Sequence, residues 1–118
     1  MKLKMTIGQD EYLATLIDSK AVEGFITQLP LKLTLQYYAG AEKISDLPAR
    51  LSAEGSPPGT AASVGDLAYY APWGNLAIFY KSSGYASGLI KLGSIEYNGK
   101  KLASYNKPIE ALLEIVNE

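Results

Sequence analysis

The stretch from residue 65 to residue 80 constrains the fold of this chain more than any other. Residues 65–70 and 75–80 are both rich in side chains that favour β-structure. Pro72, Gly74 and Asn75, which separate them, are turn formers. The pattern predicts two short strands joined by a turn. The same stretch holds five of the chain's twelve aromatic residues, which are Tyr69, Tyr70, Trp73, Phe79 and Tyr80.

The N-terminal residues predict a β-hairpin. Apolar and polar side chains alternate over residues 2–7, which is the period of a half-buried strand. Residues 8–10 suit a turn, and residues 12–17 return as a second strand. A secretory signal needs a continuous apolar stretch instead of this alternation. We therefore interpret the start as the first strand of a cytoplasmic protein.

One α-helix is expected over about residues 19–29. Asp18 or Ser19 can cap its N-terminus, and Pro30 marks its end. Its single apolar stripe is wide enough to cover one opening or one face of a sheet. The apolar residues that form this stripe at helical spacing are Val22, Phe25, Ile26 and Leu29.

Further strands and loops follow the helix. Apolar and polar residues alternate cleanly over residues 31–38, and residues 42–45 suit a short partner strand. Residues 47–64 contain three of the six prolines and predict a long irregular loop. Residues 81–88 are small and polar, which predicts a mobile loop. Residues 89–97 predict another strand, followed by an Asn98-Gly99 turn.

The C-terminal residues 108–117 fit two structures. The run from Glu110 to Glu114 contains good helix formers, whereas Ile109, Ala111, Leu113 and Ile115 alternate as in a strand. We choose the strand, because a barrel of many short strands removes its exposed edges only if the last strand pairs near the first. The expected fold is mainly β: a closed antiparallel barrel of about eight strands with one α-helix, in a single domain over residues 1–118.

Composition excludes several classes of function. The chain has 118 residues and a net charge of −1, so nothing attracts a polyanion and nucleic acid is not an expected partner. Neither cysteine nor histidine is present, which excludes thiol and imidazole nucleophiles and thiolate metal sites. The longest apolar runs are far too short to span a membrane, so no membrane partner is expected.

Three short motifs, in order, resemble those of a known family. They are Gly65-x-Leu67-Ala68-Tyr69-Tyr70, Ala77-Ile78-Phe79-Tyr80 and Leu92-Gly93-Ser94-Ile95. Together they are similar to the second half of cyclophilins, and more closely to small bacterial and archaeal cyclophilin-like proteins. The order of strands and helix extends the resemblance over the whole chain. It implies a cyclophilin-like barrel with a groove for a peptide-like or small ligand, and it implies no metal and no cofactor.

The resemblance assigns roles to individual residues. It implies that Phe79 forms the floor of the groove and that Tyr69 and Tyr70 line it. Cyclophilins carry a catalytic arginine on the strand after the first helix, but the matching strand here, residues 33–38, has none. Losing one such donor costs about 3–4 kcal/mol at a transition state. We therefore expect a ligand-binding protein with little or no prolyl isomerase activity.

The residues expected to contact the ligand are Gln36, Tyr38, Tyr69, Tyr70, Trp73 and Phe79, with loops 47–63 and 81–88 beside them. Alternatives remain open. Gln36 or Tyr38 could replace the missing arginine as a donor in a weak prolyl isomerase. The tyrosines could instead fill the core or form the face of a homo-oligomer. Paired carboxylates such as Glu42 and Asp46 could perform acid–base chemistry, but solvated charges and turn caps are the simpler interpretation.

Overall fold

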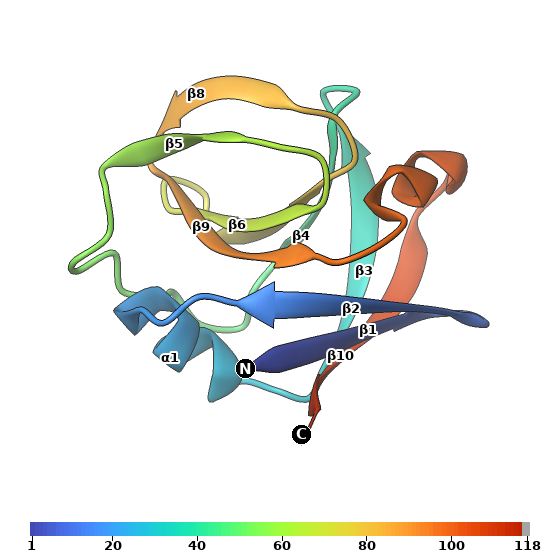
Figure 1. Ribbon diagram of the computed structural model, residues 1–118, viewed down its shortest axis with the longest axis horizontal. Helices are drawn as coiled ribbons and strands as arrows, with labels where there is room; N and C mark the ends of the chain where they lie inside the picture. The colour runs from blue at the N-terminus through green and yellow to red at the C-terminus, as the bar shows by residue number, and fades with distance from the viewer. Residues whose placement is uncertain (117–118) are drawn as a thin grey trace.

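The molecule is built around a closed antiparallel β-barrel (Figure 1). The structure is a computed structural model and describes residues 1–116. Around the barrel the strands follow the order β1-β10-β3-β4-β7-β6-β9-β2. These eight strands are β1 Lys2–Ile7, β2 Asp10–Leu16, β3 Leu31–Tyr38, β4 Glu42–Asp46, β6 Asp66–Tyr70, β7 Asn75–Phe79, β9 Leu89–Ile95 and β10 Ile109–Val116. The mainly-β closed barrel expected from the sequence is confirmed.

The C-terminal strand closes the barrel. β10 pairs with β1 on one side, through Met5 opposite Leu113, and with β3 on the other. The choice of a strand for residues 108–117 is therefore confirmed over Ile109–Val116, and residue 117 lies outside the described residues. Alternation along the strands turns every second side chain inward. The largest inward-facing side chains are fully buried and include Leu3, Leu35, Leu67, Tyr69, Leu76, Ile78, Leu92 and Leu113.

Helix α1, Lys20–Ile26, is shorter than the expected 19–29. The Ser19 hydroxyl caps its N-terminus by accepting the Val22 N–H at 3.2 Å. Beyond Ile26 the chain continues in tight turns, because the residue before a proline is disfavoured in the helical region. Leu29 still packs against the core from this turn, which explains its place in the apolar stripe. Phe25 is fully buried, so the helix covers one opening of the barrel.

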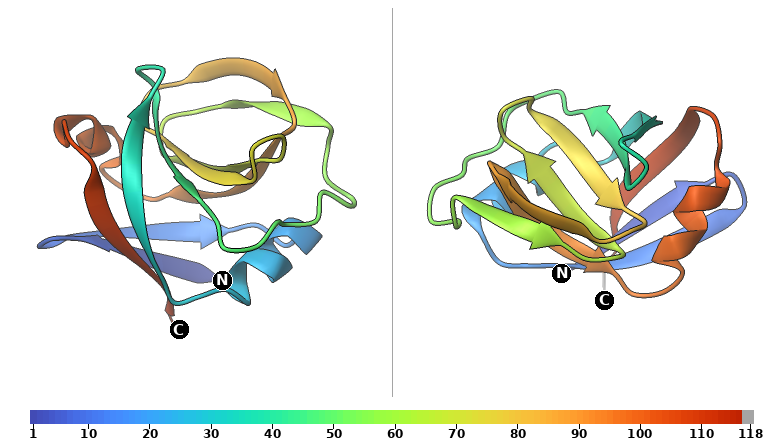
Figure 2. Two further views of the ribbon diagram at one scale, coloured as in Figure 1. Left: turned by 180° about the vertical axis from the view of Figure 1, so that it is seen from behind. Right: turned by 90° about the horizontal axis from the view of Figure 1, so that it is seen from above.

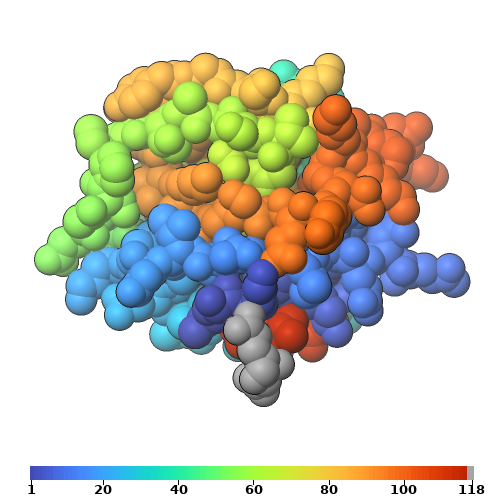
Figure 3. Space-filling model, viewed as in Figure 1, coloured from blue at the N-terminus to red at the C-terminus, as the bar shows by residue number. Residues whose placement is uncertain are grey.

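A second layer lies outside the barrel and corrects the two predicted loops. β5, Gly59–Ala62, pairs with β8, Ser83–Ser87, as a separate two-stranded sheet. This pair lies over the outer face of β6, β7 and β9 (Figure 2). On one face of the molecule, β8, β5, β9 and β2 form successive bands (Figure 3). The residues buried between the layers are Ala62, Ala68, Ala77, Phe79 and Leu89.

A short 3-10 helix, η1 Gly99–Ser104, follows the predicted Asn98-Gly99 turn. Asn98 has a φ of 64°, in the left-handed region that asparagine tolerates better than most residues. Leu102 is fully buried in the barrel core. The 3-10 helix thus packs against the barrel on the side away from α1 in Figure 1. This 3-10 helix was not expected from the sequence.

Candidate functional site

A pocket of about 190 Å³ lies outside the barrel, where the second layer meets the ends of β3, β4 and β6. Strand β7 supplies its floor. Along β7, Leu76 and Ile78 turn into the barrel, and the alternate residues turn outward into the pocket. The lining residues are Tyr38, Glu42, Tyr70, Trp73, Asn75, Ala77, Phe79, Ser83, Ala86 and Leu89.

Three aromatic rings meet at this pocket. The Trp73 ring is 5.2 Å from the Tyr38 ring and 5.3 Å from the Tyr70 ring, centroid to centroid. The interplanar angles are 87° and 83°, so both contacts are edge-to-face, a favoured geometry for aromatic pairs. Tyr38 is 39% exposed and Trp73 is 52% exposed. Two of the three rings are therefore partly accessible to solvent.

The turn that carries Trp73 is held by the chain's only arginine. Arg50 Nη1 donates a hydrogen bond to the Ala71 carbonyl at 2.8 Å. Its guanidinium also packs against Gly74, where a Cβ would lie 3.5 Å from Cζ. Gly74 has a φ of 70°, which glycine adopts without strain. Arg50 therefore supports the rim of the pocket without lining it.

Two polar side chains of the pocket lining carry oxygen atoms that have no hydrogen-bond or ion-pair partner among residues 1–116. Asn75 is 2% exposed, and its Nδ2 donates to the Leu76 carbonyl at 3.2 Å. Its Oδ1 accepts no hydrogen bond from residues 1–116. The Glu42 carboxylate forms no ion pair within the same residues. Burial raises the pKa of Glu42 above its usual value.

The structure brings four of the six predicted site residues together. Tyr38, Tyr70, Trp73 and Phe79 all line the pocket. Tyr69 does not: it is 1% exposed inside the barrel, where its hydroxyl accepts the Leu51 N–H at 3.2 Å. The reason is strand alternation, because neighbours in β6 point to opposite faces. Gln36 is exposed on β3 and lies outside the pocket lining.

Sequence reasoning missed the polar part of the pocket. Asn75 was interpreted as a turn former, and Glu42 was considered only as a partner of Asp46. The register of β4 against β7 places Glu42 opposite Phe79 and Asp46 opposite Asn75. Only Glu42 lines the pocket. The alternation of residues 75–79 could have identified Asn75, since it shares a face with Phe79.

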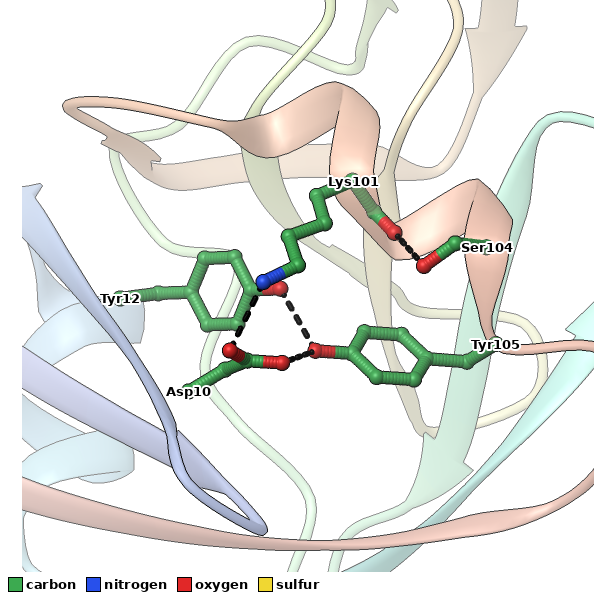
Figure 4. A network of polar contacts seen from close by, with 5 residues as sticks. All are labelled: Asp10, Tyr12, Lys101, Ser104 and Tyr105. Atoms are coloured by element: carbon green, nitrogen blue, oxygen red, sulfur yellow. Dashed lines mark hydrogen bonds and ion pairs between the residues drawn. The ribbon is translucent and has the colours of Figure 1, made fainter.

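A second polar cluster joins the β1–β2 turn to the 3-10 helix (Figure 4). Asp10 accepts from Lys101 at 2.7 Å and from the Tyr105 hydroxyl at 2.5 Å. The Tyr12 and Tyr105 hydroxyls are 2.8 Å apart. The hydrogen bonds from Lys101 and then Tyr105 lower the pKa of Asp10. Because its polar groups satisfy one another, we interpret this cluster as structural.

Lys43 is a buried cation of the barrel interior. It is 2% exposed, and its Nζ donates to the Tyr105 carbonyl. Burial lowers the pKa of Lys43. Its ammonium also lies 5.8 Å from the centroid of the Tyr80 ring, a cation–π distance. Lys43 faces away from the pocket, since Glu42 and Lys43 are neighbours in one strand.

Residues 1–116 contain no group of three acidic, histidine or cysteine side chains that could hold a metal ion. No helix in this part of the chain is both long enough and apolar enough to cross a bilayer. The cytoplasmic location stays a prediction.

Comparison with known proteins identifies the family. The model of the cyclophilin-like family matches residues 5–114. This chain belongs to the cyclophilin-like family. The solved structures that are similar include that of the hypothetical protein AF2241 from Archaeoglobus fulgidus, with a TM-score of 0.75 and 19% sequence identity. The similarity covers 98% of this chain and 95% of the archaeal one, and at this identity it shows a shared fold. No curated protein matches the sequence significantly.

The resemblance to cyclophilins implies a catalytic arginine on the strand after the first helix, which is β3 here. Its residues Leu31–Tyr38 contain no arginine, and Arg50 is engaged with the Ala71 carbonyl. Tyr38 is the β3 residue that reaches the pocket. The family and the fold are thus shared, and the absence of a catalytic equivalent of the cyclophilin arginine stays an expectation from the resemblance.

Proposed function

We propose that this protein binds one side chain, or one ring, of a peptide-like or small ligand in the pocket floored by Phe79. The pocket volume of about 190 Å³ supports this size. A cavity of about 150 Å³ accommodates benzene, whereas pockets for drug-sized ligands measure roughly 300–1,000 Å³. The pocket thus suits a single group of a ligand whose remainder stays outside.

The observation that carries this proposal is the convergence of three aromatic rings and a buried, unpartnered amide oxygen on one apolar floor. A few well-placed polar groups within an apolar lining are typical of ligand sites. The aromatic rings supply apolar contact area, and the Asn75 oxygen supplies orientation. The proposal needs neither metal nor cofactor.

Trp73 makes the proposal testable, because it is the chain's only tryptophan and lies at the pocket. We expect titration with a proline-containing peptide library to change Trp73 fluorescence and to shift backbone amide signals of residues 70–79.

The substitution Tyr70→Ala should weaken binding about tenfold, because it removes one ring of the rim. Tyr97→Ala is the matched control, since Tyr97 is 78% exposed and lies outside the pocket. Amide shifts scattered away from the pocket would contradict the proposal.

Weak prolyl isomerisation is the second candidate, and one observation favours it over no catalysis. Tyr38 lines the pocket, and a tyrosine hydroxyl can donate a hydrogen bond. Gln36, the other suggested donor, lies outside that lining. A coupled assay that measures the rate of cis–trans isomerisation of an Xaa-Pro peptide tests this candidate. A rate equal to the uncatalysed one would remove this candidate.

A further inference from the structure

The two unpartnered polar groups of the pocket define what kind of group it accepts. Asn75 Oδ1 is a hydrogen-bond acceptor only, and it is buried where it meets no donor from residues 1–116. Buried polar atoms in folded proteins are nearly always paired. Asn75 lines the pocket, so a donor on a ligand gains this oxygen as a partner once the amide turns toward the pocket.

The charge of the lining favours a cation. Glu42 places a carboxylate at the pocket, and none of the lining residues is lysine or arginine. The register pair of Glu42 with Phe79 brings the carboxylate to the same outer face as the floor. Lys43 cannot neutralise it there, because Lys43 is buried in the barrel and donates to Tyr105. The carboxylate is thus available to a ligand.

The aromatic rim acts in the same direction. The faces of tyrosine and tryptophan rings are electron-rich and attract cations, and perpendicular rings form the cages that bind ammonium groups. Tyr38 and Tyr70 both stand nearly perpendicular to Trp73. An anion would be repelled by the Glu42 carboxylate, and a purely apolar group would leave both polar oxygens of the pocket unpaired.

We propose that the pocket binds an alkylammonium group, whose N–H donors pair with the Glu42 carboxylate and, once the Asn75 amide turns toward the pocket, with Asn75 Oδ1. Its methylene chain packs on Phe79 beneath the aromatic rim. This inference rests on the proposed function, that the pocket binds one small group of a ligand. The same chemistry is offered by a lysine side chain of a peptide and by a free small amine. The experiment separates these two sources.

Butylammonium chloride and 1-butanol are the primary probes, because they have the same chain length and differ in charge and donors. Each is titrated at constant ionic strength while Trp73 fluorescence and backbone amide shifts are followed. We expect butylammonium to bind with a dissociation constant on the order of millimolar, as suits so few atoms. Its amide shifts should cluster in residues 75–79 and 83–87, and butanol should bind at least about tenfold more weakly.

Glu42→Gln keeps the shape of the side chain and removes its charge. It should weaken butylammonium binding about tenfold and leave butanol binding unchanged. Glu54→Gln is the matched control, because Glu54 is exposed in the loop before β5 and lies outside the pocket. A lysine peptide acetylated only at its N-terminus keeps a free side-chain ammonium. If this peptide binds more tightly than butylammonium, a peptide is the source of the group. Equal or weaker affinity of the peptide would identify a free amine.

The cation inference fails if butanol binds as tightly as butylammonium, if Glu42→Gln has no effect on the amine, or if the shifts scatter over the surface. In the first two cases the pocket still binds a small group, so the proposed function stands. The proposed function itself fails if neither probe, nor any proline-containing peptide, perturbs Trp73 or the amides of β7.

Discussion

At the scale of single residues, strand alternation decides which side chains form the pocket. Tyr69 and Tyr70 are adjacent residues of the same type, yet Tyr69 is buried in the barrel and Tyr70 lines the pocket. The sequence pattern 65–70 predicted the strand but did not tell which tyrosine faced inward, because both faces of β6 are covered and both neighbours are apolar in character. A strand buried on both faces loses the polar–apolar contrast that reveals its orientation.

Asp66, which lies between Gly65 and Leu67 of the first motif, has a structural role. Its carboxylate accepts the Ser63 N–H at 2.9 Å and the Ser94 hydroxyl at 3.1 Å, and it pairs with Lys91 at 3.5 Å. Asp66→Ala should reduce the free energy of unfolding by about 1–3 kcal/mol, because two part-buried hydrogen bonds to the buried carboxylate are lost. Urea denaturation measures this loss. Glu11→Ala, at an exposed hairpin position, should change stability by less than about 0.5 kcal/mol, and an equal effect of both changes would argue against this role.

The Asp10 cluster predicts how stability depends on pH. The pKa of Asp10 is lowered in the folded state, so its contribution is complete above its ordinary pKa of 3.8 and is lost as pH falls further. The pKa of Tyr105 is raised, chiefly by burial, so stability also falls as pH rises above its ordinary value of 10.0. The pKa of Lys101 is raised by its hydrogen bond to Asp10, so stability also falls as pH rises above the ordinary lysine value of 10.5.

Asp10→Asn tests this dependence. Free energies of unfolding are measured for both proteins between pH 2 and pH 11, a range chosen to bracket these values. The variant should lose less stability than the wild type as pH falls below about 4, since an amide does not titrate. If both proteins lose the same stability at acid pH, protonation of Asp10 does not affect the free energy of unfolding, and the prediction is wrong.

At the scale of elements, close backbone approach explains the Leu92-Gly93-Ser94-Ile95 motif. Gly93 pairs with Leu16 across the β2–β9 seam. A Cβ at Gly93 would lie 2.2 Å from the Thr15 carbonyl oxygen and 3.0 Å from Leu16 Cα. The glycine thus allows the seam that closes the barrel. The motif is visible in the sequence. The reason for its glycine, the close approach of β2 and β9, becomes visible only when strands distant in the sequence are paired.

Gly93→Ala should therefore destabilise the barrel by about 1–3 kcal/mol or more, because backbone at the seam must shift. Thermal and urea unfolding measure the loss. Gly84→Ala is a suitable control, since a Cβ there meets no atom within 4 Å. If both variants unfold alike, the seam tolerates the added methyl group and this explanation of the motif is wrong.

The β5–β8 layer shows why the predicted loops 47–64 and 81–88 were only partly right. Its strands consist mostly of glycine, serine, alanine and threonine, which are poor local signals of β-structure except for threonine. Gly59 permits the pairing, because a Cβ there would lie 2.4 Å from the Ala86 carbonyl oxygen. The layer depends on packing against the barrel. The unbroken apolar run Leu76–Phe79 was the available clue, since a strand buried on both faces requires a cover.

At the scale of the whole molecule, two cores of unequal size share strands β6, β7 and β9. The barrel core contains apolar side chains from every barrel strand except β4, whose buried side chain is Lys43, together with apolar side chains of α1 and the 3-10 helix. The outer cluster has five fully buried members, and three of them are alanines. Because stabilisation by burial grows with apolar area, the outer layer is held less strongly than the barrel. The pocket lies where this weaker layer ends.

Native-state hydrogen exchange should therefore separate the two layers. Amides of residues 59–62 and 83–87 should open with a lower free energy than those of β1, β3 and β10, because opening this layer exposes little apolar area. Filling the pocket with a ligand should slow exchange in residues 83–87, since Ser83 and Ala86 line it. Barrel strands β1 and β10, which lie outside the pocket, serve as the internal control. Exchange of both layers at one common free energy would mean that the molecule opens only as a unit, and that ligand entry does not depend on a separate motion of β8.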